Sequence, residues 1–274
     1  MFSTNELKRL AEIVAENIQQ EPFEYLPKRS KKRYPSVQGW SERFSNYYWS
    51  SSTEPLSDWE QINQLTERLG VYAQRLAAKE RIDSDIEAAT VNDVFELFKW
   101  GGVLRGKDHN PPSIKIINQV ISSAIEYNIN TDAPMDSAWT KLAAFSTAWL
   151  EENTDKPPHI IYDSRVSVAL LERIDQAVEM QSNLVVLKNR LNSAGLGYVD
   201  GRGGNRKERV QKLKQKKWSI GYGKWSSQII SSKIIDAIVL ELNSKTRYGK
   251  MRYKNCSYSW NARGVEMVLF MEGY

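Results

Sequence analysis

The stretch that decides the fold is Trp139-Thr-Lys-Leu-Ala-Ala-Phe145 together with Pro157-Pro-His-Ile-Ile-Tyr-Asp163-Ser-Arg-Val166. It sets Lys141 inside an amphipathic helix, then a loop with two prolines, and then Asp163 at the start of another helix. Each residue alone has an ordinary explanation, because aspartate is a common helix N-cap and a lysine can extend from a helix flank into solvent. The combination of Lys141 with Asp163 22 residues later indicates a functional site more strongly than either residue alone.

Helical periodicity continues on both sides of this stretch. Apolar residues recur at helical spacing over residues 7–18, 59–76, 91–98, 114–125, 139–149, 166–174, 229–242 and 263–271. The capping residues that we expect at helix starts are Ser3 with Glu6, Ser57 with Glu60, Ser113, Asp136 and Asp163. The alternation typical of strands is limited to a short ribbon at 251–254, so the sequence predicts an all-α fold.

The first 55 residues differ from the rest of the chain. Residues 22–55 contain four prolines, many serines and an aromatic cluster formed by Trp40, Phe44, Tyr47, Tyr48 and Trp49. We therefore expect residues 1–55 to form an N-terminal helix and an irregular arm whose aromatic side chains pack on the main body. Residues 56–274 then form the helical domain. A length of 274 residues suits one domain, or two small ones that share a cleft.

Composition excludes several classes of protein. Apolar residues make up 41% of the chain, but no apolar run approaches the roughly 18 residues of a membrane span. The only cysteine is Cys256 and the only histidines are His109 and His159. These counts argue against a disulfide framework, a four-cysteine zinc site and an iron–sulfur cluster. We expect a soluble cytoplasmic protein that uses no metal and no other cofactor.

Positive charge is concentrated in three segments, residues 28–33, 202–217 and 245–254. Together they hold 18 basic residues and one acidic residue, Glu208, whereas the rest of the chain holds 20 basic and 32 acidic residues. Clustered Lys and Arg neutralise phosphates and release counterions, so this distribution favours nucleic-acid binding over a purely solvated surface.

Two glycine-containing loops are candidates for such contacts. Residues 101–107 have the glycine spacing of a phosphate-binding loop, but they lack its Ser or Thr and follow a helix rather than a strand. Glycines also let a loop approach a DNA backbone closely, and the nearby basic residues are Lys99, Arg105 and Lys107. The second loop, residues 201–207, contributes Arg202, Arg206 and Lys207.

Aromatic residues follow the second loop at positions 218, 222 and 225. Basic residues interleaved with rings suit a nucleic acid, with cations on phosphates and rings on bases. Trp218 and Trp225 have the alternative of packing in the core, and the sequence leaves both possibilities open.

The segments around Lys141 and Asp163 resemble the helix-hairpin-helix DNA glycosylase superfamily, in particular its 8-oxoguanine glycosylase-like branch. Residues 140–143 match the place of that family's lysine helix, and residues 162–166 match its aspartate segment, whereas residues 135–139 replace its glycine-containing hairpin. More loosely, Lys-Trp-Gly-Gly at 99–102, Tyr-Asp-Ser-Arg-Val at 162–166 and the stretch 263–274 resemble bacterial glycosylase-fold proteins of anti-phage defence.

The resemblance implies two helical subdomains around a cleft and a DNA glycosylase that flips out and excises a modified base. The base is either an oxidised purine or a hypermodified phage base. The resemblance assigns Asp163 as the catalytic aspartate and Lys141 as the Schiff-base lysine, with water as the other possible nucleophile. We expect a further DNA contact from Arg165, and a base pocket lined by Trp100, Tyr222, Trp225 and Gln228.

The expected partner is double-stranded DNA, phage DNA included, and we expect a monomer. Two alternatives stay open: a non-enzymatic DNA-binding protein that uses only the basic segments, and an RNA-binding or RNA-processing protein. Treatment of modified duplex DNA with the protein and then with alkali separates these classes, because only a glycosylase leaves abasic sites that break.

Overall fold

The computed structural model describes residues 2–24, 36–49, 55–104, 110–201 and 206–273. Within these ranges most residues lie in helices and each strand is two or three residues long, which confirms the all-α class. None of the helices in the same ranges combines the length and the apolar composition that a membrane crossing requires.

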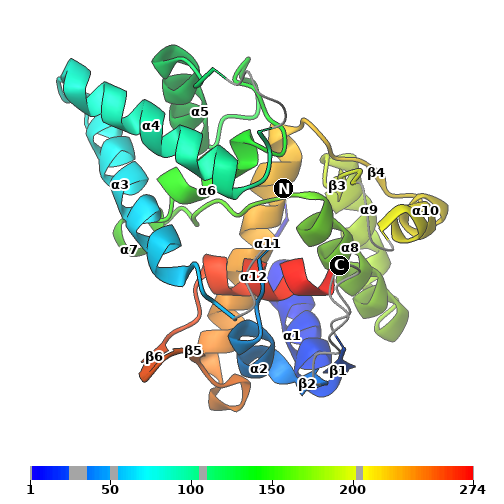
Figure 1. The fold of residues 1–274 in the computed structure, drawn as a ribbon. Helices are drawn as coiled ribbons and strands as arrows, with labels where there is room; N and C mark the ends of the chain where they lie inside the picture. The colour runs from blue at the N-terminus through cyan, green and yellow to red at the C-terminus, as the bar shows by residue number, and fades with distance from the viewer. Residues whose placement is uncertain (1, 25–35, 50–54, 105–109, 202–205, 274) are drawn as a thin grey trace.

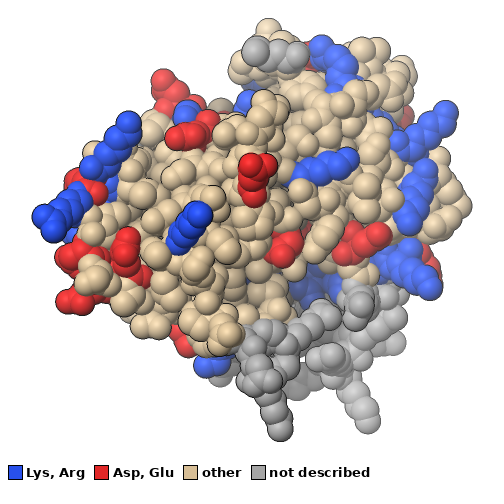
Figure 2. Space-filling view, turned by 90° about the horizontal axis from the view of Figure 1, so that it is seen from above, with Lys and Arg blue, Asp and Glu red and all other residues tan. Residues whose placement is uncertain are grey.

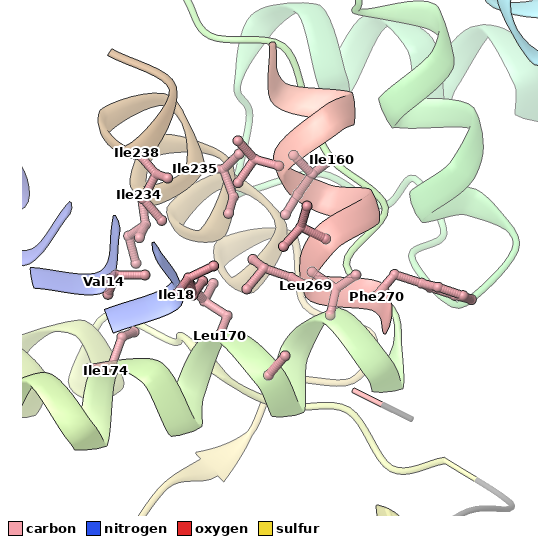
Figure 3. Close-up of a cluster of buried hydrophobic side chains, with 14 of the residues drawn as sticks. Val14, Ile18, Ile160, Leu170, Ile174, Ile234, Ile235, Ile238, Leu269 and Phe270 are labelled. Atoms are coloured by element: carbon pink, nitrogen blue, oxygen red, sulfur yellow. The ribbon is translucent and has the colours of Figure 1, made fainter. Parts of the chain in front are cut away.

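The larger of two hydrophobic clusters joins the N-terminal helix to the second half of the chain (Figure 1). Ile18, Leu170 and Leu269 approach one another from three different helices in Figure 3. Burial of each such side chain stabilises the fold by roughly 1.5–3 kcal/mol. Most of its helical residues come from α1 (Thr4–Gln20), α2 (Gly39–Ser45), α8 (Ser164–Met180), α9 (Leu184–Ser193), α10 (Arg206–Gln215), α11 (Trp225–Ser244) and α12 (Ala262–Glu272).

The second cluster occupies the other half of the molecule in Figure 1. It is built by α3 (Trp59–Ala77), α4 (Ser84–Trp100), α5 (Ile114–Glu126) and α6 (Trp139–Ser146), and the short α7 (Leu150–Asn153) follows α6. Helix α11 runs from one half to the other, since Trp225 belongs to the second cluster and Ile230 to the first. The clusters therefore divide the chain at places other than residue 55.

The strands form three small pairs. The antiparallel pairs are β1 (Pro22–Phe23) with β2 (Val37–Gln38) and β5 (Met251–Tyr253) with β6 (Cys256–Tyr258), and the parallel pair is β3 (Gly197–Tyr198) with β4 (Ser219–Ile220). The ribbon predicted at 251–254 is confirmed as β5, which follows the single turn η1 (Thr246–Tyr248).

The described part of the N-terminal arm lies against the larger cluster. Trp40 is fully buried, and its Nε1 donates to the Ala15 carbonyl at 2.9 Å. Arg43 is also buried and pairs with Glu272 of α12, whose other carboxylate oxygen accepts from Arg173 Nε at 2.9 Å. A buried charge is tolerated when it is paired in this way, and the network ties arm, α8 and α12 together.

Helix starts follow the predicted capping residues at some places and depart from them at another. Ser3 and Glu6 form a capping box on α1, and Ser113 and Asp163 accept backbone N–H groups at the starts of α5 and α8. The capping box expected at Ser57 with Glu60 is wrong, because α3 begins after Asp58 and Glu60 pairs with Lys254 instead.

Candidate functional site

Lys141 and Asp163 line one pocket, with a volume of about 760 Å³. Lys141 is the third residue of α6, which belongs to the second cluster, and Asp163 immediately precedes α8 of the larger cluster. Other walls come from the segment around residue 200 and from one face of α10. The fold thus brings together two residues that lie 22 positions apart in the sequence.

Asp163 is held at the N-terminus of α8 by its own side chain. Its Oδ1 accepts the backbone N–H groups of Arg165 at 2.8 Å and Val166 at 3.0 Å. Within the described part of the chain, Oδ2 accepts no hydrogen bond from the protein. One carboxylate oxygen therefore fixes the geometry and the other is available to a ligand, while the helix dipole favours negative charge at this end.

Lys141 is buried, with 4% of its surface exposed. Its Nζ donates to the Ser137 carbonyl at 2.6 Å. Burial lowers the pKa of the Lys141 amine below the ordinary 10.5, and the opposing influence of the Asp163 carboxylate raises it only in part. An amine with a lowered pKa holds a larger neutral fraction near pH 7, which is the form that acts as a nucleophile.

Three glycines leave room for this arrangement. A methyl carbon on Gly101 would lie 2.4 Å from Cδ and Cε of Lys141, and one on Gly201 would lie 2.2 Å from the Ser164 hydroxyl. A methyl carbon on Gly273 would lie 2.1 Å from the Arg165 carbonyl. These separations are far below van der Waals contact, so each glycine is in direct contact with Lys141 or with the start of α8.

A buried hydrogen-bond chain connects the neighbours of the two residues. The Thr140 hydroxyl accepts the Tyr162 backbone N–H at 2.7 Å and donates to Gln228 Oε1 at 2.6 Å. Gln228 Nε2 in turn donates to the Ile160 carbonyl at 2.6 Å. Thr140 precedes Lys141 and Tyr162 precedes Asp163. The hydrogen bonds between Thr140, Tyr162 and Gln228 therefore fix the position of Lys141 relative to Asp163.

Aromatic rings and one guanidinium form another wall. Trp49 lines the pocket, and its ring lies 5.2 Å from that of Phe270. The Arg165 guanidinium lies over both rings, 4.4 Å from the Phe270 centroid and 5.3 Å from the Trp49 centroid. Sequence reasoning missed Trp49 as a pocket residue, because only packing across the two clusters brings the arm to this place.

Basic side chains of α10 face the same pocket. Lys207, Gln211 and Lys214 line it at spacings of four and three residues, which places them on one face of the helix. Lys207 and Lys214 are exposed, whereas Arg206 lines the pocket as a buried residue. Helix α10 lies to the right in Figure 1, and the right-hand edge of the surface in Figure 2 carries several Lys and Arg side chains.

The structure corrects two residues of the predicted base pocket. Trp225 is buried in the second cluster, where its Nε1 donates to the Ala133 carbonyl at 2.9 Å. Gln228 is 1% exposed and is used up by the Thr140 and Ile160 hydrogen bonds. Both side chains are held by partners distant in sequence, and neither lines the 760 Å³ pocket. Trp218 is also buried and donates to Asp175.

The remaining predicted residues take different positions. Tyr222 lines the pocket and is exposed, so it lies at the rim. Trp100 lies behind Trp49: its carbonyl accepts from Trp49 Nε1 at 2.8 Å and its own Nε1 donates to Asp58. Lys99 does not line the pocket; it is exposed on α4, 3.7 Å from Glu96. Arg105, Lys107 and Arg202 lie outside the described residues.

Two further observations complete the description of the site. Among the described residues no three His, Cys, Asp or Glu side chains are grouped so that they could hold a metal ion. Comparison of the chain with protein-family models, with curated proteins and with solved structures finds no match.

Proposed function

We propose that this protein is a DNA glycosylase that removes a modified base. The observation that carries the proposal is the buried Lys141 amine in one pocket with the N-capping Asp163 carboxylate, beside the basic face of α10. A protein that only binds DNA has a use for the basic face, but it does not need a desolvated amine in one pocket with a carboxylate. The resemblance of residues 140–143 and 162–166 to the glycosylase superfamily supports the same function.

Asp163 acts on the sugar in this proposal. As the N-glycosidic bond lengthens, positive charge develops on the deoxyribose, and a fixed carboxylate oxygen beside it stabilises the transition state. The base leaves with the bonding electrons and takes a proton from solvent. In this proposal the 760 Å³ pocket, which is lined by residues of α6, α8 and α10, receives the nucleotide after the base has left the stack.

Lys141 supplies the nucleophile. Its neutral amine attacks C1′ of the sugar as the bond to the base breaks, and the nitrogen then loses one proton to solvent. The C1′–O4′ bond breaks next, and O4′ takes the second amine proton, which leaves an imine between Nζ and C1′. The Ser137 carbonyl accepts a hydrogen bond from Nζ and so fixes its position. The absence of a side chain at Gly101 leaves room for Cδ and Cε of Lys141. Attack by water on C1′ is the alternative, and it leaves an intact abasic site.

The target is a base in double-stranded DNA, either an oxidised purine or a hypermodified base of phage DNA. Lys207 and Lys214 of α10 bind the phosphates, and rings at the pocket wall contact the extruded base. Mass spectrometry of bases released from oxidised DNA and from several phage DNAs identifies the target. The same material treated with alkali shows strand breaks only if bases have been removed.

Asp163→Asn tests the proposal at the residue that the chemistry needs most. The amide keeps an oxygen that can cap α8, so we expect an unchanged fold and duplex affinity. Base release should fall by about 10²-fold or more, since a neutral amide does not stabilise the sugar cation. Base release within a few-fold of the unchanged protein would reduce Asp163 to a helix cap and overturn the mechanism.

A further inference from the structure

We infer that Glu266 is a positioning residue of the proposed site, and that it acts together with Arg263 one turn away on α12. The pair holds the helix that carries Lys141 and the segment that carries Asp163 in a fixed arrangement. The inference rests on the proposed function, because it assigns a role in base excision to a pair outside the pocket. Neither Glu266 nor Arg263 lines the 760 Å³ pocket, so the pair acts on the reaction only through other residues.

The segment that leads to Asp163 depends on Glu266 for one of its backbone hydrogen bonds. The Ile161 N–H donates to Oε2 of Glu266 at 2.7 Å. The carbonyl before it and the N–H after it are held by side chains of α11 and α6. Residues 160–162 belong to none of the described strands, so these side chains replace the partners that a neighbouring strand would supply. Loss of the carboxylate would therefore release the backbone two positions before Asp163.

Arg263 makes the corresponding contact on the side of Lys141. Its Cζ lies 5.4 Å from the Trp100 ring centroid and 5.1 Å from that of Phe145. Its Nε and Nη2 are buried and have no hydrogen-bond partner in the described part of the chain, so the rings are what the guanidinium packs against. Trp100 precedes Gly101, which lies against the Lys141 side chain, and Phe145 follows Lys141 by one turn of α6. Helix α12 is thus attached to the two elements that enclose the lysine.

The negative charge of Glu266 does more than accept a hydrogen bond. A neutral glutamine could accept the Ile161 N–H equally well, and a buried ion pair often adds no stability over apolar residues of the same volume. Glu266 is 3% exposed, and its Oε1 accepts from Nη1 of Arg263. The acid therefore balances a cation that lies in the interior close to the proposed nucleophile.

Both members of the pair act electrostatically on the Lys141 amine. Burial is the largest influence on its pKa and lowers it, whereas the carboxylates of Asp163 and Glu266 raise it. The guanidinium groups of Arg263 and Arg165 lower it again. Removal of the Glu266 charge alone would leave both guanidinium groups less opposed, so the pKa of Lys141 should fall further below 10.5.

Glu266→Ala and Glu266→Gln separate the hydrogen bond from the charge. Base release at saturating duplex should fall by about 10²-fold in Glu266→Ala, because a shift of Asp163 by about 1 Å costs that much in rate. Glu266→Gln keeps an oxygen for the Ile161 N–H and should stay within about tenfold of the unchanged protein. Duplex affinity should stay within roughly threefold in both, since the cations of α10 remain. If the unpaired Arg263 unfolds these variants, the same two changes are compared in an Arg263→Met background.

Acetylation of Lys141 measures the effect of the charge without DNA. Trace acetic anhydride reacts with neutral amines only, and peptide mass spectrometry gives the yield at Lys141 over a pH series. The midpoint should lie below 10.5 in the unchanged protein and should move to lower pH in Glu266→Gln, because Arg263 and Arg165 keep their charges. A purely structural Glu266 would alter the yield and leave the midpoint in place.

Glu241 on α11 provides the matched control. It is 4% exposed and pairs with Lys245 at 2.6 Å, so it is also a buried acid paired with a cation of its own helix. It does not line the 760 Å³ pocket and is not among the strongest influences on the pKa of Lys141. Glu241→Ala and Glu241→Gln should leave the acetylation midpoint and base release unchanged. Equal base release by Glu266→Ala and Glu266→Gln, or an unmoved midpoint in Glu266→Gln, would overturn the positioning role and leave Glu266 as a structural ion pair.

Failure of this inference and failure of the proposed function give different results. If the glycosylase proposal is wrong, the unchanged protein releases no base from any DNA, while the acetylation midpoint still moves in Glu266→Gln. If only the role of Glu266 is wrong, the unchanged protein releases bases, and Glu266→Ala releases them as fast as Glu241→Ala does.

Discussion

The buried surroundings of Lys141 lower the pKa of its amine. The same side chain on a solvated helix face is an ordinary cation, but here it is enclosed by α6, by Gly101 and by the Ser137 carbonyl. A helix of large apolar residues predicts that such a lysine either extends to solvent or is buried for a reason. The structure selects burial, and it adds Asp163 as the nearby opposite charge.

The pH dependence of covalent trapping tests the state of this amine. Only the deprotonated amine attacks, and burial lowers its pKa, so the yield of borohydride-trapped protein–DNA adduct should rise with pH. The rise should reach its plateau below 10.5, the ordinary pKa of lysine. Short incubations over a pH series, each reduced at one common pH and resolved on a gel, provide the measurement. A yield that keeps rising towards 10.5 would describe a solvated lysine and contradict the proposed environment.

Gly101→Ala tests the contact that positions the amine. The new methyl group would lie 2.4 Å from Cδ and Cε of Lys141, so the lysine side chain has to move. Misplacement of a nucleophile by about 1 Å costs roughly a hundredfold in rate, and we expect a loss of trapped adduct on that scale. The fold should hold, since Gly101 has an ordinary helical φ of −68°.

Gly102→Ala is the matched control for that change. Gly102 has a φ of +63° and nothing within 4 Å of an added methyl group. The control therefore adds a backbone cost of about 1 kcal/mol and no contact with Lys141. Equal loss of adduct in the two variants would mean that the turn as a whole matters, and the specific contact between Gly101 and Lys141 does not.

Helix α10 arranges basic residues on one face, which the composition of this segment alone does not predict. Residues 202–217 read as a basic stretch in the sequence, and the few apolar positions, Val210 and Leu213, give a weak helical signal. The structure forms a helix of ten residues from Arg206 to Gln215 and turns one face to the pocket. Arg206, predicted as a DNA contact, begins this helix as a buried residue.

The α10 face predicts a specific pattern of salt dependence. Lys207→Ala with Lys214→Ala should weaken binding to all duplexes alike and should lower the slope of log affinity against log salt by nearly two units, about 0.9 for each phosphate contact. Filter binding over a series of salt concentrations measures it. Lys212→Ala with Lys216→Ala is the control of equal charge, because neither residue lines the pocket and Lys216 pairs with Glu179. An equal change of slope in both variants would place the DNA elsewhere.

For the molecule as a whole, the sequence predicts those structural features that depend only on residues close together in the chain. Periodic stripes and the Asp163 cap follow from local patterns, and the structure contains them. The burial of Trp225 and Gln228 does not follow from the sequence, because their partners, the Ala133 and Ile160 carbonyls, are distant along the chain. The position of Trp49 in the pocket also depends on packing between the two clusters, which no local pattern records.

His159 lies between helices α5 and α11, and its burial makes the stability of the fold depend on pH. Its Nε2 lies 3.0 Å from the Ala124 carbonyl of α5, its Nδ1 lies 3.1 Å from the Ser232 hydroxyl of α11, and its ring stacks on Tyr127 at 4.5 Å. Burial lowers the pKa of His159 from 6.5 to about 4. Between these values the unfolded chain binds more protons than the folded one, so stability falls as pH drops.

We expect the free energy of unfolding to decrease by about 3 kcal/mol between pH 6.5 and pH 4 on account of this histidine. His159→Gln removes the titration, and urea unfolding of both proteins across this range separates its share from that of the carboxylates. The variant should be less stable at pH 7, where it loses buried hydrogen bonds, but its stability should decline less on acidification. Parallel pH profiles of the two proteins would contradict a neutral buried His159.

The three close glycine contacts have a consequence for finding relatives of this protein. Charge on a DNA-binding surface can move by a turn, or pass from Lys to Arg, without loss of attraction. A glycine that lies against Lys141 or against the start of α8 cannot be replaced in this way, because any side chain would collide with these atoms. A sparse search pattern should therefore combine the two side chains of the proposed site with these small residues and ignore the basic segments. Its five positions are Gly101, Lys141, Asp163, Gly201 and Gly273.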